Sequence, residues 1–238
     1  MRTIFAASAV LAVMAYVPQG HAQSTVTVDA AANIYGAGQK SAPGPGGGEL
    51  PPFVVVPKHT KCITVTAVTG SDTANCASGE GCITIDNNEH EGTHWNDPDG
   101  TGAYPPTTSN TGYNSVSGIT APYGGYLVGL FTTGKKPKGA TPPALDFTTG
   151  SGTSFTSLAP LLNQTFFVGD GLTGDGSGTV QTFAVPPKAK ALYLGISDAC
   201  GFNGGPGCYI DNVGSYTATV TTSTAPCAAI AAEALLAR

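Results

Sequence analysis

The chain has 238 residues, a formal net charge of −5 and only 11% charged residues. An acidic, weakly charged surface does not attract nucleic acid or anionic lipid, so we expect neither as a partner. Thirty-three glycines and eighteen prolines favour turns and short strands over helices, while 41% hydrophobic residues suffice for a core.

Residues 1–22 have the features of a secretory signal peptide. Arg2 is followed by an apolar stretch, and the small residue Ala22 gives a cleavage point. The apolar stretch is shorter than the roughly 20 residues that cross a bilayer, and Pro18 interrupts it. No later segment reaches that length, so we expect no transmembrane segment after cleavage. The sequence thus predicts a secreted, periplasmic or cell-surface protein, and leaves open whether it is attached to the cell envelope.

Residues 23–51 read as an N-terminal extension, in which a short strand-like piece precedes the Pro- and Gly-rich loop SAPGPGGGELPP. The next segments, FVVVP and KCITVTAVTG, carry the β-branched runs and the alternation of strands. Residues 70–124 are mostly Gly, Asn, Asp, Ser, Thr and Pro, and we interpret them as a long insertion in which functional residues are expected.

The second half contains more regular strand patterns, which are GGYLVGLF, TFFVGDG, TVQTFAVPP, KALYLGIS and VGSYTATVT. Several short strands separated by turn signals predict an all-β fold, a jelly-roll β-sandwich over residues 52–224 with long loops. Residues 225–238 have high helix propensity and predict a short C-terminal helical tail.

An even number of cysteines in an exported chain indicates disulfides, although six cysteines allow fifteen pairings. Two pairs are close enough to clip single loops, and the remaining two cysteines would then meet over a long range. The expected pairs are Cys76–Cys82, Cys200–Cys208 and Cys62–Cys227. A zinc site is the weaker interpretation, because no CxxC spacing occurs.

The segment His90-Glu91-Gly92-Thr93-His94 fits the HExxH pattern of zinc hydrolases. That chemistry requires a helix, but Gly92 lies inside the motif and no apolar helical period surrounds it. No histidine follows His94 as a third ligand. A solvated loop accounts better for this segment, and a zinc metallopeptidase stays a remote alternative to a protein that is not an enzyme.

Two further motifs match calcium loops only in part. Residues 96–100 resemble the start of an EF-hand, but the twelfth position counted from Asp97 is Thr108 instead of the required glutamate. Residues 169–176 resemble one turn of a calcium-binding β-roll, which needs several stacked copies. We interpret this second segment as a turn between strands.

The stretch DACGFNGGPGCYIDN gives the stronger metal candidate. Asp198 ends one predicted strand, and Asp211 and Asn212 begin the next, so a hairpin-like loop brings three side chains with oxygen donors together. Hard oxygen donors suit calcium, which also offsets the repulsion between neighbouring carboxylates. The alternative is a Gly-rich loop in which the carboxylates cap backbone N–H groups.

The run LVGLF, FFVGDG, QTFAVPPKAKALYLGISD and DNVGSYTATV resembles the C-terminal half of bacterial calcium-dependent galactophilic lectins of the PA-IL type, and related exported proteins with a galactose-binding-like jelly roll. The resemblance implies calcium ligands at Asp198, Asp211 and Asn212, with carbonyls from the 198–212 loop and from residues 70–72. Sugar hydroxyls would complete the coordination. The family's sugar-contacting loop has only a loose analogue here, at His90, His94 and Asn96-Asp97-Pro98, and Trp95 could stack on a sugar or pack the loop against the sandwich.

We therefore expect a secreted calcium-dependent carbohydrate-binding protein of the galactose type. The alternative is an exported surface or matrix protein that keeps the jelly roll without binding free sugar, because a fold does not fix a function. The sequence leaves open the sugar and whether the chain forms a homo-oligomer.

Overall fold

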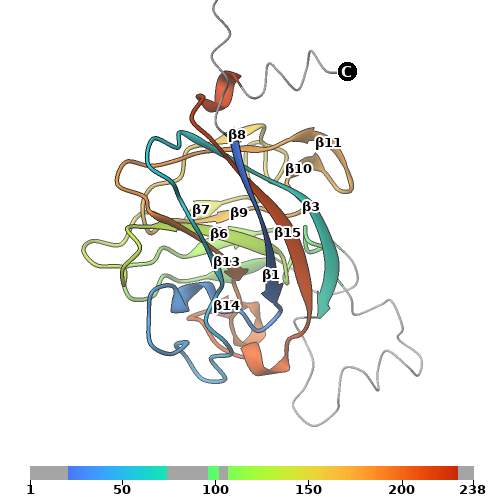
Figure 1. Ribbon diagram of the computed structural model, residues 1–238. Coiled ribbons are helices and arrows are strands. Elements are labelled where there is room, and N and C mark those ends of the chain that lie inside the picture. Colours follow the sequence, from blue (N-terminus) through green and yellow to red (C-terminus); the bar gives the residue numbers. More distant parts are fainter. Residues whose placement is uncertain (1–20, 74–95, 102–106, 230–238) are drawn as a thin grey trace, which may run out of the picture.

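The computed structural model describes residues 21–73, 96–101 and 107–229. It confirms the all-β sandwich. Figure 1 shows the long strands β1, β15 and β3 crossing in front of the layer that contains β13, β6 and β9. One long-range aromatic contact joins the two layers, with the rings of Phe166 and Phe183 5.1 Å apart between centroids.

The front layer is a five-stranded sheet with the strand order β1-β15-β3-β12-β8. Its strands are β1 (His21–Asp29), β15 (Val213–Ser223), β3 (Cys62–Thr73), β12 (Thr182–Ala184) and β8 (Ser157–Leu158). Alternate residues of β15 are buried, among them Tyr216, Ala218 and Val220, as period-2 patterning requires of a sheet with one face on the core.

The second layer is a four-stranded sheet with the order β2-β13-β6-β9. Its strands are β2 (Phe53–Val55), β13 (Ala191–Ile196), β6 (Leu127–Thr132) and β9 (Thr165–Phe167). Every residue of β13 and β6 is buried, which explains why both read as continuous apolar runs instead of alternating patterns. The edge strand β2 exposes Phe53 and Val55.

Smaller elements complete the fold. A third sheet has the order β14-β4-β5-β7, and β10 pairs with β11 as a hairpin. These strands are β4 (Thr108–Asn110), β5 (Ile119–Ala121), β7 (Leu145–Asp146), β10 (Leu172–Gly174), β11 (Ser177–Val180) and β14 (Asn203–Gly204). Three short 3-10 helices are η1 (Ile34–Gly36), η2 (Cys200–Phe202) and η3 (Tyr209–Asp211).

The sandwich begins earlier than the sequence indicates. Strand β1 pairs with β15 along its whole length, from His21 opposite Ser223 to Asp29 opposite Ser215. Val28 and Ile34 are fully buried in the core. Residues 23–51 are therefore an integral part of the domain instead of an N-terminal extension that precedes residue 52.

Two expected disulfides are present, Cys62–Cys227 and Cys200–Cys208. Cys76 and Cys82 lie outside the described residues, so their pairing stays a prediction. The two disulfides are typical of a protein that matures in an oxidising compartment. Residues 227–229 are helical, which is the beginning of the expected C-terminal helix. Within residues 21–73, 96–101 and 107–229, no helix is long and apolar enough to span a membrane.

Candidate functional site

The predicted ligands Asp198, Asp211 and Asn212 belong to the loop that joins β13 to β15 and contains β14. Figure 1 shows this loop at the lower end of the sandwich. Strand β13 ends at Ile196, and Asp198 follows it. The chain then passes through η2, β14 and η3 before Asn212 leads into β15. The Cys200–Cys208 disulfide closes this loop, so the two flanks of the loop are held together independently of any bound ion.

Asp198 is fixed by its neighbours but keeps one carboxylate oxygen without a partner. Its side chain is only 3% exposed. The backbone N–H of Asp198 donates to the Tyr209 hydroxyl at 2.9 Å, and Oδ1 accepts from the N–H of Ala199 at 2.7 Å. Oδ2 is buried and has no hydrogen-bond partner within the described part of the chain. A buried oxygen of this kind is free to bind a cation.

Asn212 presents a second such oxygen. Its side chain is 6% exposed, and Nδ2 donates to the carbonyl of Ala30 at 3.1 Å, which orients the amide. Oδ1 is buried and no described residue donates to it. Asp211 is half-buried beside it.

The three side chains at this loop influence one another electrostatically. Burial raises the pKa of Asp198 from 3.8 to about 7, the Asn212 side chain and the N–H of Ala199 lower it, and the negative charge of Asp211 raises it again. Burial also raises the pKa of Asp211. The structure therefore brings the three predicted ligands together, and their role as metal ligands stays a prediction.

Two further side chains at this end of the sandwich, Asp72 and Asn96, were not expected as ligands from the sequence. They are 0% and 1% exposed, and their backbones pair as an antiparallel bridge. Asn96 Nδ2 donates to Asp72 Oδ1 at 3.5 Å. Asp72 Oδ2 and Asn96 Oδ1 are both buried and lack partners among the described residues. They add one carboxylate and one amide oxygen to the set at this end of the sandwich.

Asp72 faces the interior because β3 contains a bulge. The pairing of β3 with β15 shifts register between Thr217 and Thr219, opposite Ala67, whose φ is 50°. A bulge adds one residue to a strand and so reverses which residues face inward after it. Val65 before the bulge is buried, and after it the inward positions include Val68 and Asp72. Val65 and Val68 are three residues apart, whereas inward-facing positions of a regular strand are two apart. This spacing was the signal in the sequence from which the bulge could have been predicted.

Burial raises the pKa of Asp72 well above 3.8, the neighbouring side chains of Tyr216 and Asn96 oppose this shift, and the charge of Asp198 adds to it. The charge of Asp198 therefore acts on Asp72 across the end of the sandwich, although Asp72 lies in β3 and Asp198 follows β13 of the other sheet. The Tyr216 hydroxyl lies 2.9 Å from the carbonyls of both Asp97 and Gly125, and so ties the described segment 96–101 to this site.

Gly125 closes the site from the side of β6. Its φ is 69°, and a Cβ atom there would lie 2.5 Å from Asp72 Oδ1 and 2.7 Å from Asn96 Nδ2. Only glycine allows both this backbone conformation and the close approach to the two polar side chains.

The donor set fits a hard divalent cation. The buried unpartnered oxygens come from two carboxylates and two amides, and calcium accepts six to eight oxygen ligands in flexible geometry. Across the described ranges, no three His, Cys, Asp or Glu side chains converge as a metal-binding group. The set proposed here consists of the buried unpartnered oxygens of Asp72, Asn96, Asp198 and Asn212, with Asp211 beside them.

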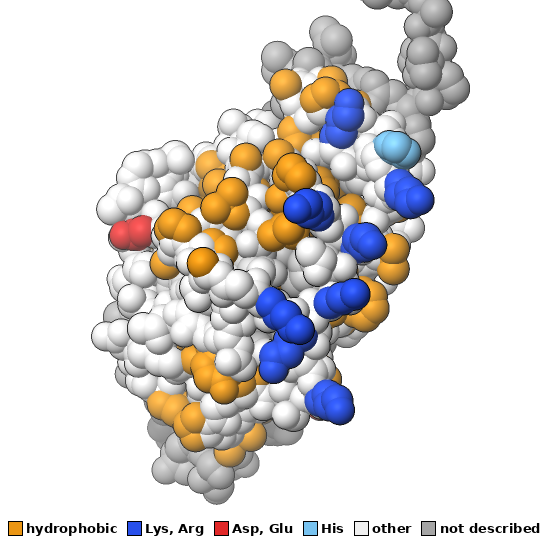
Figure 2. Space-filling view, turned by 90° about the vertical axis from the view of Figure 1, so that its left-hand side faces the viewer, with side chains coloured by type: hydrophobic (Ala, Val, Ile, Leu, Met, Phe, Trp, Pro, Cys, Tyr) orange, Lys and Arg blue, Asp and Glu red, His pale blue; other side chains and the backbone are white. Residues whose placement is uncertain are grey.

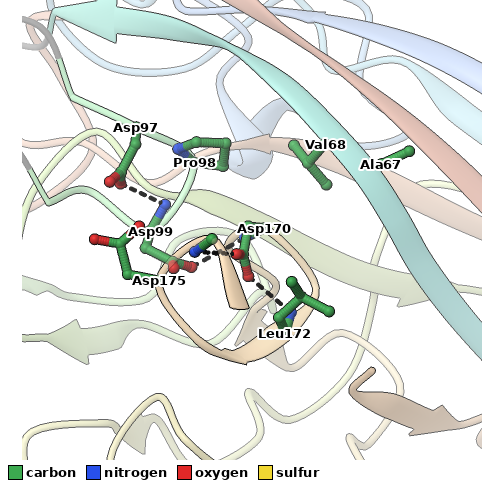
Figure 3. Close-up of a pocket in the computed structure, with 9 residues that line it drawn as sticks. Ala67, Val68, Asp97, Pro98, Asp99, Asp170, Leu172 and Asp175 are labelled. Carbon is green, nitrogen blue, oxygen red and sulfur yellow. Dashed lines mark hydrogen bonds between the residues drawn. The ribbon is translucent and has the colours of Figure 1, made fainter. Parts of the chain in front are cut away.

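A second acidic cluster surrounds a cavity of about 290 Å³ (Figure 3). The carboxylates of Asp97, Asp99 and Asp170 point toward one another there, with Asp175 beside them. Burial raises the pKa of Asp99 to about 7.

The described hydrogen bonds use these carboxylates to fix backbone turns. Asp97 Oδ1 accepts from the N–H of Asp99 at 2.9 Å, and Asp99 Oδ1 from that of Asp170 at 2.9 Å. Asp170 in turn accepts from the N–H groups of Leu172 and Gly176. Residues 169–171 form the turn before β10 and residues 175–176 the turn between β10 and β11, so the segment contains turns between strands, as the sequence indicated, together with β10 itself.

His90, His94 and Trp95 lie outside the described residues, as does the whole HExxH segment. Their proposed contacts with sugar, and the zinc alternative, therefore stay predictions. We compared the chain with protein-family models, with curated proteins and with solved structures, and none of them matches it.

Proposed function

We propose that the protein is an exported calcium-binding module that recognises carbohydrate. The observation that carries the proposal is the group of four buried oxygens without partners at one end of the sandwich, which are Asp72 Oδ2, Asn96 Oδ1, Asp198 Oδ2 and Asn212 Oδ1. A buried polar atom without a partner costs about 1–3 kcal/mol, so four in one region call for a bound species that satisfies them. A divalent cation bound among these side chains would satisfy the oxygens and offset the repulsion between the carboxylates.

Calcium is the cation that best suits this chemistry. The donors are all oxygens, and none of the four is a nitrogen or sulfur ligand of the kind that zinc prefers. Carbonyl groups of the clipped loop are additional oxygen donors of the same hardness. Bound calcium would supply a positive charge to which sugar hydroxyls could bind, and the chain's part is to hold the oxygens in place before the ion arrives.

Carbohydrate is the ligand class that the resemblance to galactophilic lectins supports. Two vicinal hydroxyls of a galactose-type sugar would complete the coordination of the ion, and His90, His94 and Trp95 stay the sugar-contacting residues that the sequence suggests. Aromatic rings such as that of Trp95 suit the apolar face of a sugar.

One observation favours a second candidate function. Asp198 and Asn212 are only 3% and 6% exposed, which suits a structural ion as well as an ion that contacts a sugar. In that case calcium would hold the loop end of an exported surface or matrix protein, without a free-sugar ligand. Both candidates require the same cation site and differ only in what contacts it.

Titration calorimetry with calcium tests the shared site. We expect one strong site in the wild type and at least a tenfold loss of affinity in Asp198→Asn and in Asp72→Asn, because each change removes one anionic donor. Asp146→Asn is the matched control, since Asp146 is exposed and bonds only within its own turn. Wild-type affinity in both site variants would show that water or backbone groups satisfy these oxygens instead.

Retention on a galactose resin then separates the two candidates. Retention that a chelator abolishes supports sugar recognition. A chelator-induced fall in melting temperature with no retention on galactose or other neutral sugars supports the structural role.

A further inference from the structure

One face of the sandwich combines exposed hydrophobic side chains with lysines. Figure 2 shows the Lys side chains gathered on this face beside hydrophobic side chains, with few acidic side chains among them. All eight lysines of the chain are exposed: Lys40, Lys58, Lys61, Lys135, Lys136, Lys138, Lys188 and Lys190. Although the net charge is −5, the positive charges are therefore distributed unevenly and gather on this face.

This face contains a groove of about 390 Å³. Its lining comes from η1 and the segment after it, from residues 50–52, and from the edge strand β2 with its neighbour β13. The lining residues are Gly36, Gly38, Gln39, Leu50, Pro51, Pro52, Phe53 and Tyr193. A groove of this size accommodates one or two sugar-sized rings.

An aromatic pair forms one wall of the groove. The rings of Phe53 and Tyr193 lie 5.2 Å apart between centroids, at 38°. Tyr193 is 7% exposed and supports Phe53, which is 54% exposed although it is one of the largest apolar side chains. Leu50 and Val55 are 44% and 65% exposed beside it. An exposed apolar patch rimmed by charge marks a binding surface.

Three lysines flank the groove, because their backbone packs against the segments that line it. A Cβ at Gly38 would lie 2.9 Å from the main chain of both Lys135 and Lys136, so this pair lies against the groove wall. Lys190 lies next to the same segment, since a Cβ atom added at Gly134 would lie 3.5 Å from the Cβ of Lys190. Its carbonyl also accepts from the N–H of Val56, directly after β2.

We propose that this groove, defined by Phe53, Tyr193 and the lysines Lys135, Lys136 and Lys190, binds an anionic oligosaccharide. The apolar face of a pyranose ring packs on Phe53, while carboxylate or sulfate groups on the sugar meet the ammonium groups at the rim. The lysines act as point charges that tolerate either anion, and none of the residues that line the groove is a proposed calcium ligand.

The concave shape favours an oligosaccharide over an anionic membrane. A flat bilayer surface would contact the exposed side chains of β2 but would leave the floor of the groove at Gly36 and Gly38 unfilled. The lining also includes Gln39, whose buried Nε2 has no hydrogen-bond partner among the described residues and suits a hydroxyl group better than an acyl chain.

Binding of fluorescent oligogalacturonate and of a heparin oligosaccharide, at low salt and with a chelator present, tests the proposal. We expect micromolar binding of at least one of them, which weakens with ionic strength. Lys135→Gln/Lys136→Gln and Phe53→Ser should each weaken it at least tenfold. Tyr123→Ser, an exposed aromatic outside the groove, should leave it unchanged. Melting temperatures of the variants check that all of them fold.

Three results would overturn the proposal. The first is no binding of either probe by the folded wild type. The second is binding that Phe53→Ser leaves unchanged, which would indicate general charge attraction. The third is tighter binding to phosphatidylglycerol vesicles than to either sugar, which would indicate a membrane surface. Because a chelator is present throughout, failure here leaves the calcium-site proposal intact, and loss of calcium binding leaves this one intact.

Discussion

Asp72 and Asp198 reach the same end of the sandwich from different sheets, and each is almost completely buried. Burial raises the pKa of Asp72 well above 3.8, and the charge of Asp198 raises it further. Two such carboxyl groups are both ionised near neutral pH only when positive charge is added between them. The state of this pair therefore depends on pH and on cations together.

The first prediction concerns pH. The pKa of Asp198 is raised from 3.8 to about 7 in the folded chain, and that of Asp99 is also about 7. In this interval the folded state holds protons that the unfolded state releases, so the metal-free protein should lose stability as the pH rises from about 4 through about 7. A pKa that differs by one between the folded and unfolded states corresponds to about 1.4 kcal/mol, so the loss from the buried Asp198 should amount to a few kcal/mol.

Calcium should reverse this dependence, because it binds the ionised carboxylates. Denaturant unfolding at several pH values, with chelator and with calcium, measures both effects, and Asp198→Asn should flatten the metal-free curve. A metal-free stability that rises with pH over the same interval would contradict the prediction.

The second prediction concerns Gly125. Gly125→Ala should lower both stability and calcium affinity, because the new Cβ would meet Asp72 and Asn96 at 2.5 and 2.7 Å. Gly150→Ala is the matched control, since Gly150 has a similar φ of 63° with nothing within 4 Å of the added atom. Both variants carry the cost of a left-handed alanine, about 1–2 kcal/mol, so the difference between their unfolding free energies isolates the clash. Equal losses would show that the site adjusts freely.

The third prediction concerns the Tyr216 hydroxyl. It lies 2.9 Å from the carbonyls of Asp97 and Gly125, and its removal in Tyr216→Phe leaves these buried groups without their donor. We expect a loss of about 1–3 kcal/mol in the free energy of unfolding. Tyr123→Phe, at a side chain that is 42% exposed, serves as the comparison and should change stability by a few tenths of a kcal/mol. If Tyr216→Phe and the wild type have indistinguishable melting curves, contacts other than the Tyr216 hydroxyl hold segment 96–101 in place.

The fourth prediction separates the two disulfides. Cys62 and Cys227 are 165 residues apart in sequence, whereas Cys200 and Cys208 are separated by eight. Chain entropy predicts a loss of roughly 5 kcal/mol for Cys62→Ser/Cys227→Ser and roughly 2–3 kcal/mol for Cys200→Ser/Cys208→Ser. The second variant should also bind calcium more weakly, because its loop no longer holds Asp198 near Asn212. Denaturant titration and calorimetry measure the two effects, and unchanged calcium affinity would show that the clip is dispensable.

The strands of the second half were predictable because their patterns are local. The run KALYLGIS became the fully buried β13, and VGSYTATVT became the alternating β15. The pairing of Cys62 with Cys227 followed from spacing, since the shorter pairs left these two. The convergence of Asp198 with Asn212 followed from their places on either side of one loop.

Other features depended on contacts that no local pattern contains. The residues of β1 do not indicate that it pairs with β15. The Pro- and Gly-rich segment that follows β1 therefore suggested an N-terminal extension. Asp72 was missed as a side-chain donor because the bulge at Ala67 reverses the inward-facing positions of β3. The lysine-flanked groove joins segments around residues 38, 53, 135 and 193, which lie far apart in the sequence.

The pairing of His21 with Ser223 places the two ends of the described chain side by side, and the Cys62–Cys227 disulfide secures the same end. The nine residues of β1 separate this point from the site near Ala30 by about 30 Å. A chain immobilised through either end would therefore orient its proposed cation site outward, away from the support. Such oriented display is the geometry that a biosensor surface, or a tether on a cell, requires.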